Sequence, residues 1–251
     1  MDTVKSARRV FEFLEYFAKV ERDVSVAELA NHYDFPNSSV SSLMRTMVSM
    51  GYLSYDARRR TYLPTARLPF LVNWVGTKLF QHDRIRRVME ELSEATGETI
   101  MVGIQNGIRV QYIHVVDATG PIRLHAEAGD FRPIALTAMG QLMLSAYDDA
   151  HVGRIVRRIN ADEPDAGKHI ALAPLLEKLN KIRADDYALS IGGTVPGGGA
   201  VACFLPEHMN DHRLVLAIGS GEYVLTHNID RFVALMKDAI ERHFSASNPE
   251  A

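Results

Sequence analysis

The chain has 251 residues, of which 47% are hydrophobic and 24% are charged, a globular composition that excludes a disordered or fibrous protein. Its single cysteine, Cys203, excludes a disulfide framework and a cysteine-only metal site. The sequence contains no run of about 18 apolar residues, so no membrane span is predicted. The net charge of −3 is uneven, because residues 1–75 carry ten Lys and Arg against eight Asp and Glu, which leaves −5 on the remainder. This length favours two domains, and the charge asymmetry indicates an N-terminal part that faces nucleic acid.

Three helices are predicted in the first fifty residues. The first is amphipathic, with apolar residues at i, i+3, i+4 and i+7: Val10, Phe13, Leu14 and Phe17. The second begins at a capping box, in which the Ser25 hydroxyl accepts the Glu28 backbone N–H and Glu28 reaches back. Pro36 ends this helix, and a third is expected over residues 39–50, closed by Gly51. Two short helices joined by a tight turn form a helix-turn-helix.

A predicted hairpin follows the third helix directly. Residues 52–55 and 61–63 alternate like strands, and the turn between them carries Arg58, Arg59 and Arg60. Arginines on a projecting hairpin suit contact with DNA phosphates, because each neutralised phosphate releases condensed counterions. Taken alone, a solvated hairpin with a basic tip explains them equally well. The helix-turn-helix directly before the hairpin favours a winged helix that binds DNA.

The remainder of the chain has an α+β pattern. An apolar segment at residues 71–75 is expected to be a connecting helix, and a second helix is predicted over 83–96 with Gly97 as its stop. Asn106-Gly107 is a strong hairpin signal between two strand-like runs. Strands are predicted at 99–105, 109–115, 122–127, 201–205 and 214–218, and helices at 137–147, 172–184 and 228–244. This succession favours an antiparallel sheet covered by helices.

Several segments resemble catalytic or metal sites but lack a defining residue. The glycines of Gly192–Gly199 have neither the Gly-Lys-Ser/Thr nor the GxGxxG spacing of a nucleotide loop. The segment around Ser220 lacks the first glycine of a nucleophile elbow. His208 and His212 lie in a predicted turn without the glutamate of a zinc-protease helix, and Cys203 is interpreted as a small core residue. We therefore expect no catalytic residue, no metal site and no cofactor.

A set of short motifs runs along nearly the whole chain. In the N-terminal part these are Ser6-Ala7-Arg8-Arg9-Val10, Ser25–Ala30, Phe35–Val40, Leu43–Met47 and Gly51-Tyr52-Leu53. In the C-terminal part they are Glu91–Thr99, Thr137–Gln141, Tyr187-Ala188-Leu189 and Pro196-Gly197. In order and spacing the motifs resemble the IclR family of bacterial transcriptional regulators. The resemblance implies a winged helix-turn-helix domain (residues 1–66), a linker helix that helps to pair such domains (67–80) and a GAF-like effector-binding domain (81–248).

The resemblance places the DNA contacts on the third helix and on the hairpin. The residues concerned are Asn37, Ser38, Ser39, Ser41, Ser42, Arg45, Arg58, Arg59 and Arg60. Family members usually open this helix with Lys-Ser-Thr and carry His or Arg on its exposed face. The Ser and Asn residues of this chain lack the bidentate fork with which arginine reads guanine, so the operator sequence does not carry over from relatives.

The resemblance also implies a pocket in the C-terminal domain. Its ligand-binding residues would be Leu124, Thr137, Ala138, Met139, Ser190, Ala200, Ala217 and Gly219. At the last four positions, relatives that sense small acids carry Asp, Cys and two Ser, where this chain has smaller or less polar residues. Each change alone is equally consistent with altered core packing, but together they favour a roomier, more apolar pocket. The helix start after Thr137 offers free N–H groups, so we expect a bulky or aromatic effector with one carboxylate or carbonyl group.

These inferences describe a cytoplasmic homo-oligomer, either a homodimer or a dimer-of-dimers tetramer. The winged helix is expected to bind double-stranded operator DNA, and a small-molecule effector to shift the population between two arrangements. No membrane partner is expected. The alternative is an enzyme or a stand-alone ligand carrier whose N-terminal domain only mediates assembly, and salt-dependent operator binding distinguishes the two. The sequence leaves the effector, the operator and the direction of regulation open.

Overall fold

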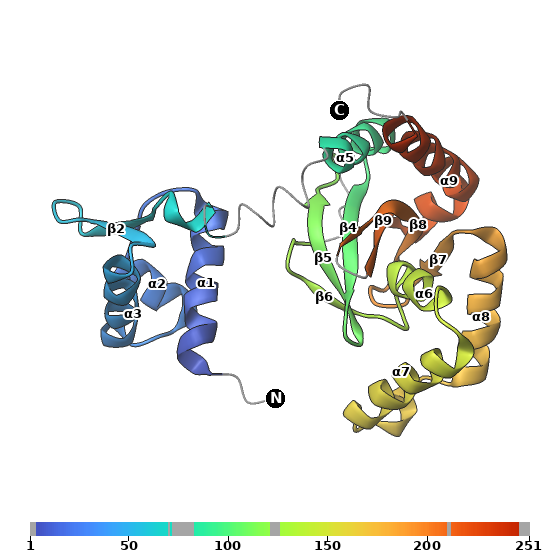
Figure 1. The fold of residues 1–251 in the computed structure, drawn as a ribbon, viewed down its shortest axis with the longest axis horizontal. Coiled ribbons are helices and arrows are strands. Elements are labelled where there is room, and N and C mark those ends of the chain that lie inside the picture. The colour runs from blue at the N-terminus through green and yellow to red at the C-terminus, as the bar shows by residue number, and fades with distance from the viewer. Residues whose placement is uncertain (1–3, 70, 72–82, 121–125, 210–211, 246–251) are drawn as a thin grey trace. The chain divides into compact units, whose positions relative to one another are not determined.

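The computed structural model describes residues 4–69, 71, 83–120, 126–209 and 212–245. The chain divides into two compact units, Met1–Gln81 and His82–Ala251, which are described separately (Figure 1). The expected linker helix at 67–80 lies largely outside the described residues, although 67–69 and 71 are helical. The same holds for the strand expected at 122–127, of which the described residues 126 and 127 are not in a strand. Among the described helices, none has both the length and the apolar content to cross a membrane.

The N-terminal unit consists of three helices and a small sheet. Its helices are α1 (Lys5–Val20), α2 (Val26–Tyr33) and α3 (Asn37–Ser49). Its strands are β1 (Val24–Ser25), β2 (Leu53–Asp56) and β3 (Thr61–Pro64), paired antiparallel in the order β1-β3-β2. Phe13 of α1 and Met44 of α3 are fully buried in one core. The predicted winged helix-turn-helix is confirmed.

Local chemistry sets where α2 and α3 begin and end. The Ser25 hydroxyl accepts the Glu28 backbone N–H at 3.2 Å, as predicted. The pKa of the Glu28 carboxyl is lowered chiefly by a hydrogen bond from Arg22, with smaller contributions that include the Ser25 backbone. Helix α3 starts two residues earlier than predicted, because the Pro36 carbonyl already accepts the N–H groups of the first turn. Gly51, at φ 79°, ends α3 in the left-handed conformation that favours glycine.

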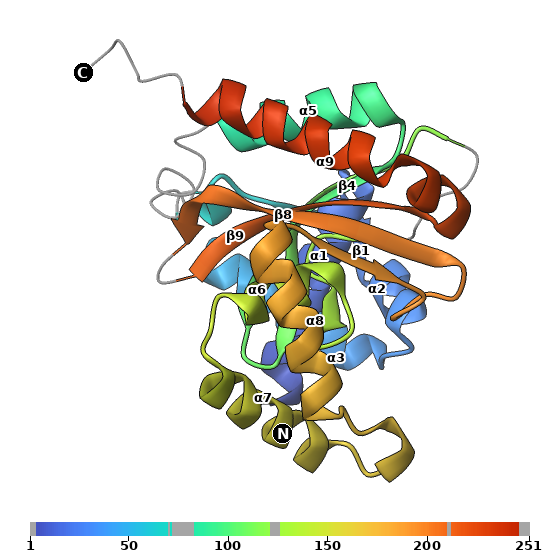
Figure 2. The ribbon, with the colours of Figure 1, turned by 90° about the vertical axis from the view of Figure 1, so that its right-hand side faces the viewer.

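The C-terminal unit is an antiparallel sheet with helices on both faces. Its strand order is β6-β5-β4-β9-β8-β7. The strands are β4 (Thr99–Asn106), β5 (Arg109–Val116), β6 (Phe131–Pro133), β7 (Ala188–Ile191), β8 (Gly198–Met209) and β9 (His212–Gly221). The helices are α5 (Asp83–Thr96), α6 (Ala138–Ser145), α7 (Asp149–Asp162), the short 3-10 helix η1 (Ala166–Lys168), α8 (Leu172–Asp185) and α9 (Glu222–Phe244). Helices α5 and α9 cover one face, and α6 and α8 cover the other (Figure 2).

The alternation of side chains along the strands divides the core into two clusters. In β9, Ala217 belongs to the cluster under α6 and α8, whereas Leu216 and Ile218 belong to the cluster under α5 and α9. Successive side chains of a strand point to opposite faces, so both faces of the central strands are buried. The predicted α+β architecture is confirmed.

Two C-terminal helices differ from the sequence-based expectation. Helix α7 was not predicted; its buried residues form a short stripe that includes Val152, Ile155 and Val156. Helix α9 begins at Glu222 rather than at the predicted residue 228. Asn228, with φ −129°, is a kink inside this longer helix and not its start. The helical pattern after the kink was therefore detected, and the turns before it were not.

Two helical glycines have opposite surroundings. A Cβ at Gly140 of α6 would lie 2.0 Å from the Ile134 carbonyl oxygen. A Cβ at Gly153 of α7 would have Leu172 Cδ2 as its nearest neighbour, at 3.6 Å. The segment before α6 thus packs against the helix backbone at a distance that only glycine allows.

We predict that Gly140→Ala and Gly153→Ala change stability in opposite directions. Gly140→Ala forces backbone apart and should lower the free energy of unfolding by about 1–3 kcal/mol. Gly153→Ala fits its space and should raise it by up to about 1 kcal/mol, because alanine is the better helix former. Urea unfolding followed by circular dichroism measures both. A Gly140→Ala variant as stable as the wild type would contradict the close packing of Ile134 on α6.

Candidate functional site

In the N-terminal unit, the start of α3 faces the β2–β3 hairpin across an open groove. The groove encloses about 1010 Å³, including open solvent. It is lined by Ser25, Val26 and Ala27 at the start of α2, Asn37, Ser38 and Ser41 of α3, and Tyr55, Arg60 and Tyr62 of the hairpin. Four predicted DNA-binding residues therefore share one surface. Hydroxyl, amide, guanidinium and helix N-terminal N–H groups are the groups with which proteins contact the DNA backbone.

The other predicted residues of α3 are not among those that line this groove. Ser42 and Arg45 are exposed, and Arg45 Nε donates to the Ser41 carbonyl at 3.3 Å. Ser39 is half-buried, and its hydroxyl accepts a hydrogen bond from Arg9 Nη1 at 2.7 Å. The Arg9 guanidinium stacks on the Phe35 ring, 4.1 Å from its centroid.

Arg9 therefore links α1 to the start of α3. The bond orients the Ser39 hydroxyl and leaves the Ser39 proton available for a DNA acceptor. Arg9 was not among the residues predicted for the DNA-binding surface. Its only signal was its place in the first motif, thirty residues before Ser39.

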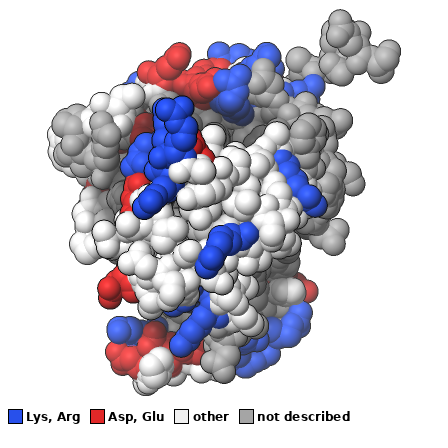
Figure 3. Space-filling model, turned by 90° about the vertical axis from the view of Figure 1, so that its left-hand side faces the viewer, with Lys and Arg blue, Asp and Glu red and all other residues white. Residues whose placement is uncertain are grey.

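The three hairpin arginines have different surroundings. The backbone N–H groups of Arg58 and Arg59 donate to Asp56 Oδ1 at 2.8 and 3.2 Å, which holds the turn. Arg59 Nη1 lies 4.0 Å from Asp23 Oδ2. Arg60 adopts φ 57°, and its side chain lines the groove. Figure 3 views the molecule from the side that carries β2 and α3 in Figure 1, and shows basic side chains among uncharged ones, with acidic side chains near the upper and lower edges of the view.

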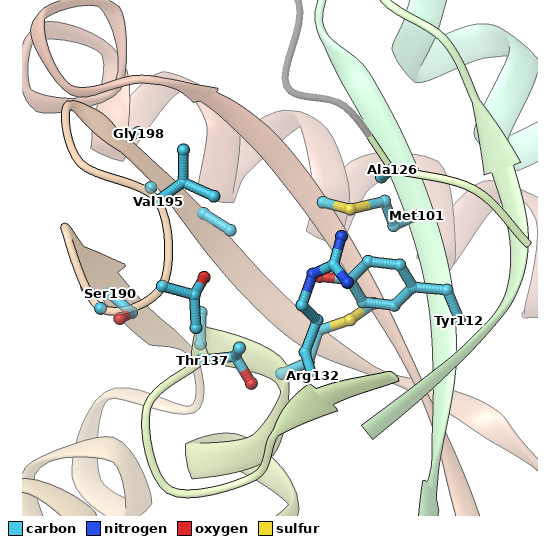
Figure 4. A pocket seen from close by; sticks show the side chains of 14 residues that line it. Met101, Tyr112, Ala126, Arg132, Thr137, Ser190, Val195 and Gly198 are labelled. Carbon is cyan, nitrogen blue, oxygen red and sulfur yellow. The ribbon is translucent and has the colours of Figure 1, made fainter. Parts of the chain in front are cut away.

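In the C-terminal unit, a pocket opens between the sheet and the start of α6 (Figure 4). It encloses about 540 Å³, part of which is open solvent. Its lining residues are Met101, Tyr112, Ala126, Arg132, Thr137, Ala138, Met139, Ser190, Gly193, Thr194, Val195, Gly198, Gly199 and Ala200. Five of the predicted ligand-binding residues lie here: Thr137, Ala138, Met139, Ser190 and Ala200.

Three predicted ligand-binding residues are placed elsewhere or are not described. Ala217 is fully buried in the core of β9, and Gly219 pairs with Ala200 across the β8–β9 ladder; neither lines the pocket. Leu124 lies outside the described residues. Tyr112 and Arg132 line the pocket but were not predicted from the sequence. They lie on β5 and on the three-residue strand β6, and no sequence motif marks either residue.

Hydrogen bonds within the chain occupy the hydroxyl groups on one side of the pocket. The Thr137 hydroxyl accepts the Gly140 N–H at 3.1 Å and donates to the Pro133 carbonyl at 3.2 Å. The Ser190 hydroxyl donates to the Leu136 carbonyl at 2.8 Å. These bonds hold the wall around the first turn of α6, whose leading N–H groups have no partner within the helix.

Potential metal ligands and the cysteine are the residues that could indicate covalent or metal chemistry, and Cys203 is buried. Within the described chain, no group of three or more His, Cys, Asp or Glu side chains is placed to hold a metal ion. Burial raises the pKa of the Cys203 thiol to about 12, which keeps it protonated and unreactive.

Two protein-family models match the chain. "Bacterial transcriptional regulator IclR C-terminal" matches residues 80–242, and "IclR helix-turn-helix domain" matches residues 6–57. The HTH-type transcriptional regulator KdgR of Dickeya chrysanthemi is 29% identical over 190 residues, which cover 74% of this chain and 61% of that protein. The chain therefore spans less than two thirds of that relative's length.

Other similarities extend over more of both chains. The transcriptional repressor IclR of Escherichia coli K12 is 22% identical over 240 residues, which cover 93% of this chain and 86% of that protein. The crystal structure of the Thermotoga maritima IclR matches with a TM-score of 0.67 at 19% identity, and covers 94% of this chain and 96% of that chain. At that identity the structural match shows a shared fold.

We predict that Arg9→Met weakens sequence discrimination by the α3 surface. The variant keeps an apolar stem over Phe35 but loses the donor to Ser39. The ratio of affinities for DNA selected by the wild-type protein and for random DNA should fall about tenfold, since a hydrogen bond to a charged group is worth roughly 1.5 kcal/mol or more. Arg8→Met, at an exposed arginine paired with Glu12, is the control. Fluorescence anisotropy measures both affinities, and equal ratios for the two variants would exclude a role for Arg9.

Proposed function

This chain belongs to the IclR family of bacterial transcriptional regulators, and we propose that it is a homo-oligomeric regulator controlled by an organic effector. The family consists of DNA-binding regulators and not of enzymes, which sets aside the alternative of an enzyme or a stand-alone carrier. We place the DNA-binding domain at residues 1–66, the linker helix at 67–80 and the effector-binding domain at 81–248. Because the protein acts on DNA, we expect it in the cytoplasm.

The groove between α3 and the hairpin is the observation that carries the DNA-binding part of the proposal. Asn37, Ser38 and Ser41 line it from α3, and Arg60 lines it from the hairpin. A recognition helix enters the major groove by its N-terminal residues, which here leaves the hairpin arginines for the flanking phosphates. We assign sequence preference to Ser39, Ser42 and Arg45 as well, since they belong to the same helix.

The pocket beside α6 carries the effector part of the proposal. Its walls are largely apolar, with Met101, Met139 and Val195 among them, and Arg132 supplies a positive charge. A ligand that matches this lining has a bulky or aromatic body and one carboxylate or carbonyl group. Ala217 and Gly219 were expected to widen the pocket, but they do not line it. The small residues that leave room for a bulky ligand are Ala200 and the neighbouring Gly198 and Gly199.

The regulatory mechanism that we propose is a population shift in a homodimer or a dimer of dimers. Operators with two half-sites are bound by two paired recognition helices, and the spacing of the half-sites mirrors the protein's symmetry. The linker at 67–80 would set the spacing between the DNA-binding domains. An effector that binds one arrangement more tightly than the other would change the fraction of protein that fits the operator.

We predict that the salt dependence of DNA binding distinguishes the hairpin arginines. Removing one charged side chain that neutralises a phosphate should flatten the slope of log K against log salt by about 0.9, so Arg60→Gln should show this change. Arg59→Gln should show less, because Asp23 already lies beside Arg59. Lys168→Gln, on η1 of the C-terminal unit, is the charge-matched control. DNA titrations between roughly 50 and 200 mM salt, the range over which phosphate contacts change affinity strongly, measure the slopes. An unchanged slope for Arg60→Gln would exclude the hairpin as a phosphate-binding element.

We also predict that filling the pocket abolishes the response to aromatic acids. Ala200→Leu adds three carbons to the lining, which removes the space for a ring whose burial is worth roughly 0.8 kcal/mol per CH₂ equivalent. Thermal shift with benzoate, phenylacetate and short keto acids measures the response. Ala184→Leu, exposed on α8, is the control for added apolar volume. If pyruvate or glyoxylate stabilises the wild type and no aromatic acid does, the proposed ligand class is wrong.

A further inference from the structure

Arg132 is the one charged residue among the described residues that line the pocket. It lies in β6, opposite Val110 of β5, so strand pairing fixes its backbone. Its side chain is 25% exposed, and its guanidinium carbon lies 5.5 Å from the centroid of the Tyr112 ring. In Figure 4 the guanidinium group and the Tyr112 hydroxyl lie close together on one wall of the pocket. An arginine enclosed in this way can hold an anion within the pocket.

The guanidinium group is already held in position. Arg132 Nη2 lies 2.8 Å from Asp130 Oδ2, and Nη1 donates to the Phe131 carbonyl at 3.2 Å. Asp130 is fixed in turn, because Oδ2 accepts the Glu127 N–H at 3.2 Å and its carbonyl accepts the Tyr112 N–H at 3.0 Å. A guanidinium group has five N–H donors, so these contacts leave donors for a ligand without any rotation of the side chain.

Tyr112 supplies a second donor at the same place. Burial is the main cause that raises the pKa of its hydroxyl, while the Arg132 charge acts in the opposite direction. The phenol therefore stays protonated at neutral pH and can donate to an anion. A carboxylate that accepts from both a guanidinium group and a phenol makes charge-assisted hydrogen bonds, which are stronger than neutral ones.

The rest of the lining limits the charge of the ligand. Asp130 already balances much of the Arg132 charge, and the Thr137 and Ser190 hydroxyls donate to carbonyl groups of the chain. Among the lining residues that the structure describes, a second anionic group would find no further cation. The remaining walls, which include Met101 and Met139, fit an apolar body.

We infer that Arg132, together with the Tyr112 hydroxyl, binds the carboxylate of the effector, so that the pocket selects apolar monocarboxylates over the matching amides. The inference rests on the proposed function, since it specifies the ligand of the same pocket. It moves the main anion contact from the first turn of α6, where the sequence placed it, to the β5–β6 side of the pocket.

The test compares aromatic acids with their amides, which have nearly the same shape but no charge. Phenylacetate and benzoate, each paired with its amide, are titrated calorimetrically into the purified full-length protein without DNA. The wild type should bind at least one acid ten or more times as tightly as its amide. Arg132→Gln should bring this ratio to about one, chiefly through weaker binding of the acid. Arg157→Gln, at an exposed arginine of α7, should keep the wild-type ratio.

Two further variants separate a contact with the ligand from a structural role. Arg132→Lys keeps the charge and loses the fork, so it should retain an intermediate ratio. Tyr112→Phe should lower acid affinity several-fold and leave amide affinity unchanged. Circular dichroism of each variant establishes that it is folded, and Arg132→Lys serves as the test should Arg132→Gln not fold.

Equal binding of acid and amide by the wild type, or no binding of any acid, would overturn the inference. An unchanged acid-to-amide ratio in Arg132→Gln would also overturn it. If that variant does not fold, the same result in Arg132→Lys would do so. Failure of the proposed function would show separately, as absence of salt-dependent DNA binding in a titration without ligand. The acid-to-amide ratio is measured without DNA and does not depend on that outcome.

Discussion

The antiparallel pairing of β4 with β9 and of β9 with β8 is the interaction on which the C-terminal unit depends. These central strands bury side chains on both faces, with Ala217 directed to one cluster and Ile218 to the other. Helices α5 and α9 are thereby held on one face, and α6 and α8 on the other. The pocket lies on the α6 side, because its lining residues Met101, Tyr112 and Met139 belong to the cluster on that face.

Close backbone approaches then shape the pocket. A Cβ at Gly193 would lie 2.2 Å from the Leu136 carbonyl oxygen, and a Cβ at Gly140 would lie 2.0 Å from that of Ile134. The segment before α6 is thus wedged between its own helix and the loop after β7, and the Ser190 hydroxyl bonds to it there. Because the backbone on this side of the pocket is closely packed, it cannot move to accommodate a larger side chain. A substitution such as Ala200→Leu should therefore reduce the space for a ligand.

The N-terminal unit orients its DNA-binding surface from a distance in a similar way. The Tyr33 hydroxyl donates to the Glu12 carbonyl at 2.7 Å, and the Tyr33 ring stacks on Phe35. Arg9 completes the arrangement by crossing from α1 over Phe35 to Ser39. Helix α3 carries Arg45 as its basic residue, whereas the hairpin carries Arg58, Arg59 and Arg60. The hairpin and α3 thus contribute different side chains to one groove.

Local signals in the sequence predicted most of the helices and strands and their order, but they missed α7 and placed the start of α9 six residues late. The capping serine at Ser25, the stop at Gly51 and the hairpin at Asn106-Gly107 are local signals, since hydrogen bonds between near neighbours and side-chain periodicity produce them. Which side chains share a site depends instead on tertiary packing. Arg132 and Tyr112 come to the pocket through strand pairing, and Arg9 reaches Ser39 across thirty residues. These contacts arise from the pairing of distant segments and the packing of their faces. A local sequence pattern therefore does not predict them.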